Sequence, residues 1–344
     1  MKVFLTGVDG YIGSLLAPYL IERGHAVLGL DTGFYREGWL YSPRQAPEAS
    51  PPILSKDLRH VQADDLAGCH VVVHLAELSN DPLGELQPAI THAINHEASV
   101  RLASLAKGAG VSRFVYASSC AVYGAGRDEI LTEESAPNPQ TAYARCKVLV
   151  ERDLAALADN GFSPVCLRNA TAFGASPRMR FDIVLNNLAG LARTTGRITL
   201  TSDGTPWRPL VHALDICRAI ACAIEAPAAA VHAQTFNVGD NAQNYQVRDI
   251  AAIVSDAFAG CRLTVGADSG DRRSYRVSFD KIHRDLPGFR CEWDARRGAA
   301  QLHDLFERID LSAERFQFRS FTRLDALKYL LRTHQLDAEL FWAA

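Results

Sequence analysis

The start of the chain constrains the fold more strongly than any other segment. Val3–Thr6 is a short apolar run with the character of a buried strand, and a helical pattern extends from the following turn to about Arg23. Between them lies the sequence Gly7-Val-Asp-Gly10-Tyr-Ile-Gly13, in which glycine recurs at every third position. Glycine permits a tight turn and lets the backbone approach a diphosphate, which then lies at the positive N-terminus of the helix. This segment predicts a strand–turn–helix unit that binds a dinucleotide.

Strands and helices continue to alternate through the first half of the chain. His25–Leu30, Val71–Leu75 and Phe114–Ala117 are further apolar runs of strand length, and Ile90–Lys107 has the spacing of a helix. This alternation is typical of a parallel sheet that is covered by helices on both faces. We therefore expect an α/β fold of the Rossmann type, with a doubly wound parallel sheet as its core.

The alternation becomes irregular after about Leu167, where we expect a smaller mixed lobe. The sequence predicts a helix over Asp182–Arg193, an extended segment over Ile198–Leu210, a helix over Asp215–Glu225 and a strand over Thr235–Val238. We divide the chain into a dinucleotide-binding domain that carries the catalytic residues (1–167), a substrate-binding lobe interleaved with it (168–295) and a C-terminal helical appendage (296–344).

An acidic residue ends the second predicted strand. Asp31 lies about twenty residues beyond the glycine turn, as the ribose-binding acid of a dinucleotide site does. A carboxylate there can accept hydrogen bonds from both hydroxyls of the adenosine ribose, and it repels a 2′-phosphate. The turn and Asp31 together predict NAD as the cofactor, with NADP as the alternative because Arg36 lies nearby.

Composition and charge exclude several classes of protein. The 344 residues are 48% hydrophobic and 22% charged with a net charge of −3, so no basic surface for nucleic acid or an anionic membrane is predicted. No apolar run approaches the roughly 20 residues that span a bilayer. The 8 cysteines include no C-x-x-C pair, and several lie in apolar surroundings, as reduced core thiols do. We expect a cytoplasmic protein without a metal site, a membrane segment or a nucleic-acid partner.

A tyrosine and a lysine share one face of a predicted helix. Tyr143-Ala-Arg-Cys-Lys147 places the two side chains one turn apart, so that the Lys147 ammonium can lie near the phenol. A positive charge there favours the phenolate and lowers the pKa of Tyr143 from about 10 towards neutral pH. Ser119 lies at the end of a predicted strand, where doubly wound sheets place their ligands. Its hydroxyl can hold an alkoxide or carbonyl oxygen while Tyr143 moves the proton.

These motifs, in this order, resemble those of the extended short-chain dehydrogenase/reductase family. Within that family, the NAD-dependent branch of nucleotide-sugar epimerases and dehydratases is the most similar. The resemblance covers roughly residues 1–295. It rests on Gly7–Gly13, His74-Leu-Ala76, Ser118-Ser119 with Val122-Tyr-Gly124, and Tyr143–Lys147.

The resemblance implies roles for residues along the whole site. Ser119, Tyr143 and Lys147 would form the catalytic set, and the helices that hold Asn95 and Tyr143 would pair into a four-helix bundle in a homodimer. The cofactor contacts that it implies are Gly7, Gly10, Tyr11, Ile12, Gly13, Asp31, Asp64, Asp65, Leu75, Ala76, Asn95, Tyr143 and Lys147. The contacts to a nucleotide-sugar substrate that it implies are Ser119, Thr171, Asn187, Leu188, Arg208, Arg272 and Tyr275.

The chain departs from the family pattern at several of these places. Sugar 4,6-dehydratases of the family carry Asp-Glu where this chain has Cys120-Ala121, and Ala121 cannot take a proton. Cys120 either acts as an acid in another kind of elimination, with a thiol pKa near its usual value of about 8.5, or fills a buried space. Thr171 stands where sugar epimerases commonly carry asparagine. Asp268 stands where an arginine is usual, so that Arg272 or the neighbouring Arg273 would have to replace it.

Several functions are compatible with these residues. The leading hypothesis is NAD-dependent epimerisation, at C4, of a nucleotide-linked hexose or uronic acid through a 4-keto intermediate. A nucleotide-sugar 4-ketoreductase would need the same residues, and a non-standard dehydratase would use Cys120. A cofactor-binding scaffold or regulator is the alternative outside the enzymes. The set of Ser119, Tyr143 and Lys147 favours an enzyme, because a cofactor sensor needs no acidified tyrosine.

Overall fold

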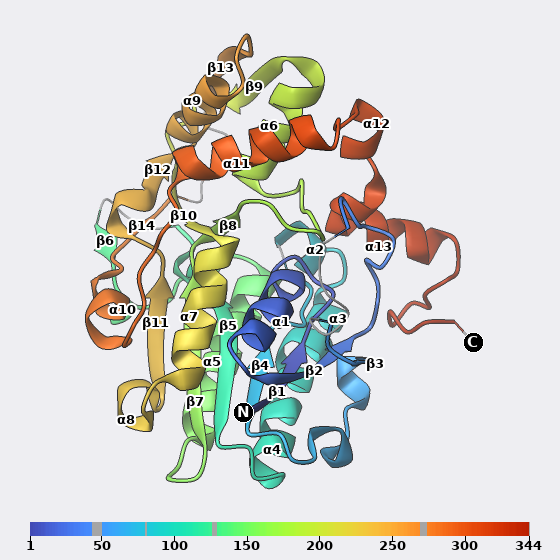
Figure 1. The fold of residues 1–344 in the computed structure, drawn as a ribbon, viewed down its shortest axis with the longest axis vertical. Coiled ribbons are helices and arrows are strands. Elements are labelled where there is room, and N and C mark those ends of the chain that lie inside the picture. The colour runs from blue at the N-terminus through green and yellow to red at the C-terminus, as the bar shows by residue number, and fades with distance from the viewer. Residues whose placement is uncertain (43–49, 80, 126–128, 269–273, 344) are drawn as a thin grey trace.

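The structure, a computed structural model, describes residues 1–42, 50–79, 81–125, 129–268 and 274–343 (Figure 1). Within these residues the core is a seven-stranded sheet in which all neighbouring strands run parallel. The strands extend from β1 in both directions, which confirms the predicted doubly wound sheet. In spatial order they are β11 (Gln234–Val238), β7 (Ser163–Asn169), β5 (Arg113–Ser119), β4 (Val71–His74), β1 (Lys2–Thr6), β2 (Ala26–Asp31) and β3 (Ile53–Ser55).

Both faces of the sheet are buried. Successive side chains of each strand point to opposite sides, so each strand contributes to the cores on both faces. In β1, Val3 and Leu5 belong to one hydrophobic core, whereas Phe4 belongs to the core on the other face. Helices cover each of these cores (Figure 1). The first core lies under α1 (Gly13–Glu22) and α7 (Ala213–Glu225), and the second lies under α4 (Ser99–Gly108) and α5 (Ala142–Leu157).

The predicted helix over Ile90–Lys107 is one nearly continuous helical segment with an irregular centre. It begins as α3 (Pro88–His92), passes through a π-helical turn at Ala93–Ala98 and continues as α4. A π-helical turn inside a helix is frequent at functional sites, because it shifts the side chains that follow. Here the turn carries Asn95, which is fully buried.

A second, mixed lobe lies beyond the carboxyl ends of the sheet strands (Figure 1). Its helices α6, α9 and α11 pack on one another around a separate hydrophobic core. Its strands are β8 (Thr171–Phe173), β10 (Trp207–His212) and β12 (Asn244–Gln246) in one small sheet, and β9 (Arg197–Ser202) with β13 (Arg262–Asp268) in another. The helices are α6 (Val184–Thr195), α9 (Val247–Ala257) and α11 (Ala295–Arg308), and β6 (Ile130–Leu131) pairs with β14 (Arg276–Val277) beside them.

One part of the predicted lobe belongs to the first domain instead. The helix and strand expected over Asp215–Glu225 and Thr235–Val238 are α7 and β11, and the prediction that they belong to the smaller lobe is wrong. β11 extends the main sheet in parallel next to β7, with Phe236 opposite Leu167. α7 packs on α1, and most of its residues are buried. A helix that is apolar on most of its circumference needs a large surface to cover it, and here the main sheet provides that surface.

The C-terminal segment returns from the lobe to the first domain (Figure 1). Leu327 and Leu330 of α13 (Arg323–Arg332) pack in one cluster with Ile90 and Ile94. Trp342 donates a hydrogen bond from Nε1 to the backbone oxygen of Thr32 at 2.6 Å. The remaining short helices are α2 (Asp81–Gly84), α8 (Ala228–Val231), α10 (Asp280–Asp285) and α12 (Ala313–Phe316).

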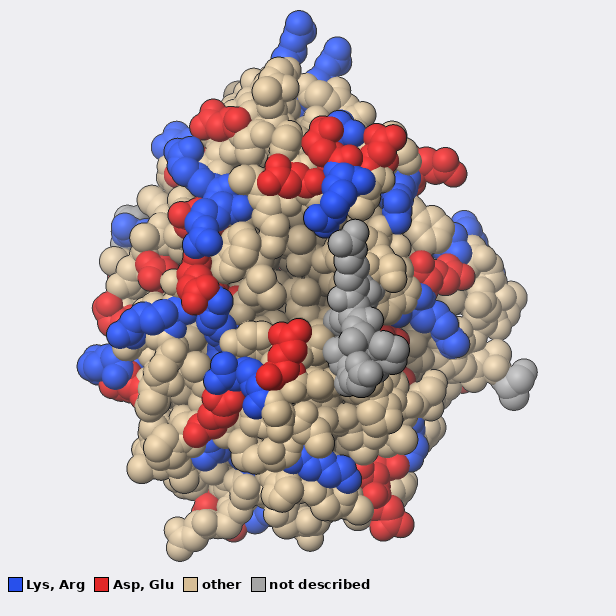
Figure 2. Space-filling view, viewed as in Figure 1, with Lys and Arg blue, Asp and Glu red and all other residues tan. Residues whose placement is uncertain are grey.

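The face of the molecule shown in Figure 2 has a mixed charge. In the view of Figure 2, Lys and Arg side chains are interspersed with Asp and Glu side chains. None of the helices in the described part of the chain is both long enough and apolar enough to span a bilayer.

Candidate active site

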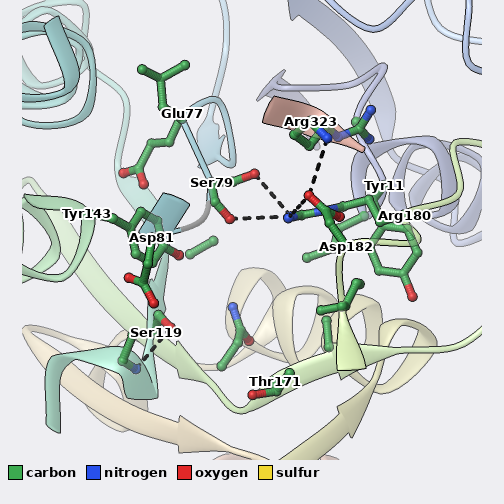
Figure 3. A pocket seen from close by; sticks show the side chains of 18 of the residues that line it. Tyr11, Glu77, Ser79, Asp81, Ser119, Tyr143, Thr171, Arg180, Asp182 and Arg323 are labelled. Atoms are coloured by element: carbon green, nitrogen blue, oxygen red, sulfur yellow. Dashed lines mark hydrogen bonds and ion pairs between the residues drawn. The ribbon is translucent and has the colours of Figure 1, made fainter. Parts of the chain in front are cut away.

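A cavity of about 800 Å³ lies between the carboxyl ends of the sheet strands and the second lobe. The first domain lines it with residues that follow successive strands, such as Gly7, Asp31 and Leu75, and the lobe contributes Asn187 and Arg208. Ligands of doubly wound sheets bind at this edge. In Figure 3, Glu77, Asp81, Ser119 and Tyr143 lie on one side of the cavity, and Tyr11, Arg180, Asp182 and Arg323 lie on the other.

The glycine turn leaves room for a dinucleotide, although its glycines do not all face the cavity. Gly7 has a φ of +72°, and a Cβ there would lie 2.9 Å from the backbone nitrogen of Ala76. Gly7, Gly10, Tyr11 and Ile12 line the cavity just before α1 begins, so the positive end of that helix faces it. Gly13 does not line the cavity: a Cβ there would lie 2.1 Å from the oxygen of Gly7, so its role is to let the helix pack on the turn.

Asp31 lies on the cavity at the end of β2. Its two carboxylate oxygens accept hydrogen bonds from the backbone nitrogens of Asp9, at 3.0 Å, and Gly33, at 2.8 Å. Each oxygen keeps a second lone pair for a ribose hydroxyl. Burial, with repulsion by Asp9, raises the pKa of this carboxyl, because both penalise its charge. A hydroxyl donor at Asp31 would favour the charged form.

The acidic pair Asp64 and Asp65, expected to contact the cofactor, does not lie on the cavity. Asp65 forms an ion pair with Lys56 at 2.7 Å and accepts a hydrogen bond from the backbone of Gln62, and neither Asp64 nor Asp65 lines the cavity. Asp57 and Leu58, a few residues earlier, do line it. The prediction that Asp64 and Asp65 contact the cofactor is therefore wrong, because Asp57 and not this pair lies on the wall of the cavity.

Leu75 and Ala76 line the cavity, as expected, and Asn95 lies behind them. The amide of Asn95 accepts a hydrogen bond from the backbone nitrogen of Leu78 at 2.8 Å and donates one to its oxygen at 3.0 Å. Since Asn95 does not line the cavity, it has no direct contact to offer a ligand there. It fixes the chain that leaves β4, and that chain includes Glu77.

The three residues of the expected catalytic set come together on the cavity. Tyr143 and Lys147 lie on α5, with the Lys147 Nζ 5.3 Å from the centre of the Tyr143 ring. Ser119 ends β5, accepts a hydrogen bond from the backbone nitrogen of Ala121, and its hydroxyl favours the ionised form of the neighbouring Tyr143. α5 starts at this position because Thr141 caps it by accepting a hydrogen bond from the nitrogen of Ala144.

The charge around Tyr143 differs from that expected from the sequence. Burial raises the pKa of the phenol, and the nearby Lys147 ammonium does not lower it enough to compensate. Two carboxylates add to the effect of burial: Glu77 lies beside Lys147, with Oε2 2.6 Å from Nζ, and both Glu77 and Asp81 oppose ionisation of the phenol. The prediction that Lys147 lowers the pKa of Tyr143 is correct in sign, but this effect is outweighed by burial and by the two carboxylates.

Cys120 has no access to the cavity. Its side chain is 1% exposed, and its thiol lies 3.2 Å from the backbone oxygen of Arg168. Burial raises the pKa of the thiol well above its usual range, so it is a poor acid–base group. The hypothesis that Cys120 acts on the substrate is therefore wrong, and the residue fills a buried space.

The substrate side is formed in part by the residues that the sequence indicates. Thr171, Asn187, Arg208 and Tyr275 all line the cavity. Asn187 donates a hydrogen bond to the backbone oxygen of Phe181 at 2.9 Å, at the start of α6. Leu188 is buried in the lobe and does not line the cavity. Arg272 and Arg273 lie outside the described residues, as does the side chain of Asp268.

Six charged residues that line the cavity were not predicted from the sequence: Asp57, Glu77, Asp81, Arg180, Asp182 and Arg323. Arg180 is paired with Asp182 at 2.8 Å and donates to Ser79 Oγ at 3.2 Å, and Asp182 accepts a hydrogen bond from the backbone of Arg323 (Figure 3). Glu77 could have been found from the sequence, because it directly follows the buried strand and His74-Leu-Ala76. A carboxylate in such an apolar segment is rarely buried unless it is paired. Arg323 had none, since its position depends on how the C-terminal segment folds back.

Comparison with known proteins agrees with this geometry. The family model described as "NAD dependent epimerase/dehydratase family" matches residues 3–239. The UDP-glucose 4-epimerase of Corynebacterium glutamicum is 28% identical over 310 residues, which cover 83% of this chain and 90% of that protein. The solved structure of MoeE5 in complex with UDP-glucuronic acid and NAD has a TM-score of 0.76 and 27% identity, and the match covers 90% of this chain and 99% of MoeE5.

A further solved structure supports the fold alone. TunA, described as an NAD-dependent NDP-hexosamine 5,6-dehydratase, has a TM-score of 0.77 at 22% identity, over 90% of this chain and 99% of TunA. The fold and the cavity define an NAD-dependent enzyme of the extended short-chain dehydrogenase/reductase type. More specifically, the chain belongs to the NAD-dependent epimerase/dehydratase family.

Proposed function

We propose that the protein epimerises a nucleotide-linked hexose or uronic acid at C4, through a 4-keto intermediate. The observation that carries this proposal is the convergence of Ser119, Tyr143 and Lys147 on the cavity, with no acid–base side chain at either of the two positions after Ser119. Oxidation at C4 needs only the first three residues, whereas ordinary 4,6-dehydration also needs a second acid–base pair. Ala121 lines the cavity and cannot supply one.

Bound NAD would accept a hydride from C4 and later return it. Tyr143 would take the proton of the C4 hydroxyl, and Ser119 would donate a hydrogen bond to the same oxygen as it becomes a carbonyl. Lys147 would place its ammonium beside the phenol and the nicotinamide ribose. The 4-keto sugar would then rotate in the cavity, so that its other face is reduced at C4. Tyr143 would return the proton to the C4 oxygen in that step.

The nucleotide half of the substrate would lie against the second lobe. Arg208 and the start of α6 at Asn187 offer a guanidinium fork and a helix N-terminus, both of which bind phosphate oxygens. The named activity of the C. glutamicum relative and the ligands of MoeE5 support a UDP-linked sugar. The cofactor contacts would be made by Gly7, Gly10, Tyr11, Ile12, Asp31, Asp57, Leu58, Leu75 and Ala76.

The test is to incubate the purified protein with a panel of nucleotide-linked hexoses and uronic acids in deuterated water. Epimerisation gives a product of unchanged mass, because the hydride is returned from the cofactor and not from solvent. A 4-ketoreductase would oxidise these sugars in reverse, with a loss of two hydrogens and formation of NADH from added NAD⁺, and a dehydratase would give a loss of water. Tyr143→Phe should abolish the conversion and Tyr19→Phe, on the outer part of α1, should not. A panel in which no sugar changes would contradict the proposal.

We also expect a homodimer in the cytoplasm. α4 and α5 pack side by side on one face of the sheet and would supply the two helices of each subunit to a four-helix bundle. All 8 cysteines are free, as in proteins of a reducing compartment. Size-exclusion chromatography with light scattering should give twice the chain mass of 37.6 kDa, and the mass of a monomer would contradict the expectation.

A further inference from the structure

Glu77 is a buried carboxylate in the middle of the catalytic set. Its side chain is 2% exposed and that of Lys147 is 5% exposed, with 2.6 Å between Oε2 and Nζ. The other carboxylate oxygen accepts a hydrogen bond from the hydroxyl of Tyr116 at 2.7 Å. The Lys147 ammonium also donates to the backbone oxygen of Ala117 and lies 4.6 Å from the centre of the Tyr116 ring. Glu77 is therefore held from two sides and lines the same cavity as Tyr143.

A carboxylate in this place changes the charge of the site. Burying an ion is costly unless it is paired, and Glu77 and Lys147 form such a pair. Burial lowers the pKa of the Lys147 ammonium, but attraction by Glu77 outweighs this effect, so the pKa is raised. Burial raises the pKa of the Glu77 carboxyl as well, whereas Lys147 and the Tyr116 hydroxyl oppose that rise. With 2.6 Å between Oε2 and Nζ we treat the two as an ion pair that is neutral in sum. The Lys147 charge that would otherwise favour a phenolate at Tyr143 is thus offset by a charge of the opposite sign.

We propose that Glu77 is a positioning residue that anchors the Lys147 ammonium and offsets its charge, so that Tyr143 keeps its proton until a further positive charge enters the cavity. The oxidised nicotinamide carries such a charge and the reduced form does not. The phenol would then give up its proton when NAD⁺ is bound and hold it when NADH is bound. In the proposed epimerisation Tyr143 first takes a proton and later returns it, and this change of state would serve both steps. The inference rests on the proposed function in this respect, but its test needs no substrate.

Groups other than Glu77 and Lys147 also face the Tyr143 phenol and affect its ionisation. The titratable and charged groups around the phenol come from several elements and include both signs. They are Lys147 on α5, Ser119 and Tyr116 on β5, Glu77 after β4, Asp81 on α2 and Arg180 before α6. Asp81 also opposes ionisation of Tyr143, and its carboxylate accepts a hydrogen bond from the hydroxyl of Thr141 at 2.6 Å. Glu77 is the carboxylate of this set that contacts Lys147, so its removal should have the larger effect.

The test is a titration of the tyrosinate absorbance that needs no substrate. It uses the protein as purified, with every variant brought to the same NAD⁺ content, and takes the difference between wild type and Tyr143→Phe to isolate one phenol. The same difference is measured in the Glu77→Gln background. Glutamine has the same shape, and its amide can accept from Lys147 and donate to Tyr116, so the contacts can be kept while the charge is removed.

We expect the midpoint of Tyr143 to fall by about one pH unit or more in Glu77→Gln, because a nearby negative charge is lost. Glu77→Asp keeps the charge at a greater distance and should give a midpoint between the two, which preserves the test if the glutamine variant does not fold. Glu22→Gln removes an exposed carboxylate of α1 and should change nothing. An unchanged or higher midpoint in Glu77→Gln would overturn the inference.

The pH profile of turnover provides the second measurement. If a nucleotide sugar is converted, the acid limb of kcat/KM should move to lower pH in Glu77→Gln by the same amount as the titration. A role in packing alone would lower kcat at every pH without moving the limb, and would overturn the inference. If no sugar is converted but the titration shifts, the proposed function fails while the role of Glu77 stands.

Discussion

The two walls of the cavity differ in how they are built and in how far the sequence reveals them. The first wall consists of residues that follow parallel strands, such as Gly7, Asp31 and Ser119, and each lies within a short local pattern. The second includes Arg180, before α6, and Arg323, from the C-terminal segment. They meet through Asp182, which pairs with one side chain and accepts from the backbone of the other. Local patterns therefore locate the chemistry, whereas long-range folding completes the enclosure.

The sharpest test of this contrast removes the reacting hydroxyl from the first wall. Tyr143→Phe should lower kcat by roughly 10²–10⁴-fold, the range that general acid–base groups contribute. The content of bound NAD should stay close to that of wild type, because the aromatic ring and Lys147 remain. Turnover is measured by product formation, and bound NAD by its release on denaturation. A variant that loses less than tenfold would show that another group moves the proton.

The turn of the first wall should tolerate no added atom at its third glycine. In Gly13→Ala the new Cβ would lie 2.1 Å from the Gly7 oxygen, and overpacking of this kind costs about 1–3 kcal/mol or more. We expect a lower midpoint of denaturation and loss of bound NAD. Gly108→Ala is the matched control, because nothing lies within 4 Å of its Cβ. Equal stability of the two variants would refute the packing role assigned to Gly13.

The second wall should affect cofactor binding more than chemistry. Arg323 is 2% exposed, lies 4.1 Å from the centre of the Tyr35 ring and lines the cavity. Burial, with repulsion by Arg180, lowers its pKa to about 10, which still leaves it charged at neutral pH. In Arg323→Leu we expect NAD to bind about tenfold more weakly, the effect of losing one charged contact. The affinity for NAD is measured by calorimetric titration of Arg323→Leu and of the control Arg332→Leu, which changes an exposed arginine. Equal affinities of the two variants would exclude Arg323 from the cofactor site.

The smallest expected effect concerns an ion pair that joins α1 to α7 away from the cavity. Glu225 is bound by Arg23 at 2.6 Å and by His25 at 3.0 Å, and the hydrogen bond from Arg23 holds the pKa of Glu225 at about 2. Because this pKa is depressed, the stabilisation is present above the ordinary value and is lost as pH falls through the folded one. Glu225→Gln should cost at most about 1 kcal/mol at neutral pH, since the pair is partly exposed. The difference in unfolding free energy should shrink between pH 4.5 and about 2, and a constant difference would contradict this origin.

These contrasts explain which parts of the fold and site the sequence could predict. The sheet and the positions of Tyr143, Lys147 and Ser119 followed from strand length, glycine spacing and one helical turn, all of which are local. The affiliation of α7 and β11 did not, because a strand does not encode its neighbour in the sheet. Asp57 was overlooked in favour of Asp64 and Asp65, since three carboxylates in one short segment differ only in where the chain turns.

The central claim is that Tyr143 moves a proton while a hydride leaves and returns to the same carbon. The most direct measurement uses a substrate that carries deuterium at C4, taken from whichever nucleotide sugar the protein converts. We predict slower conversion with the label than without it, an epimer that retains the deuterium in full, and no net release of NADH. Loss of the label to water, or retention of it in an unchanged C4 configuration, would contradict the account.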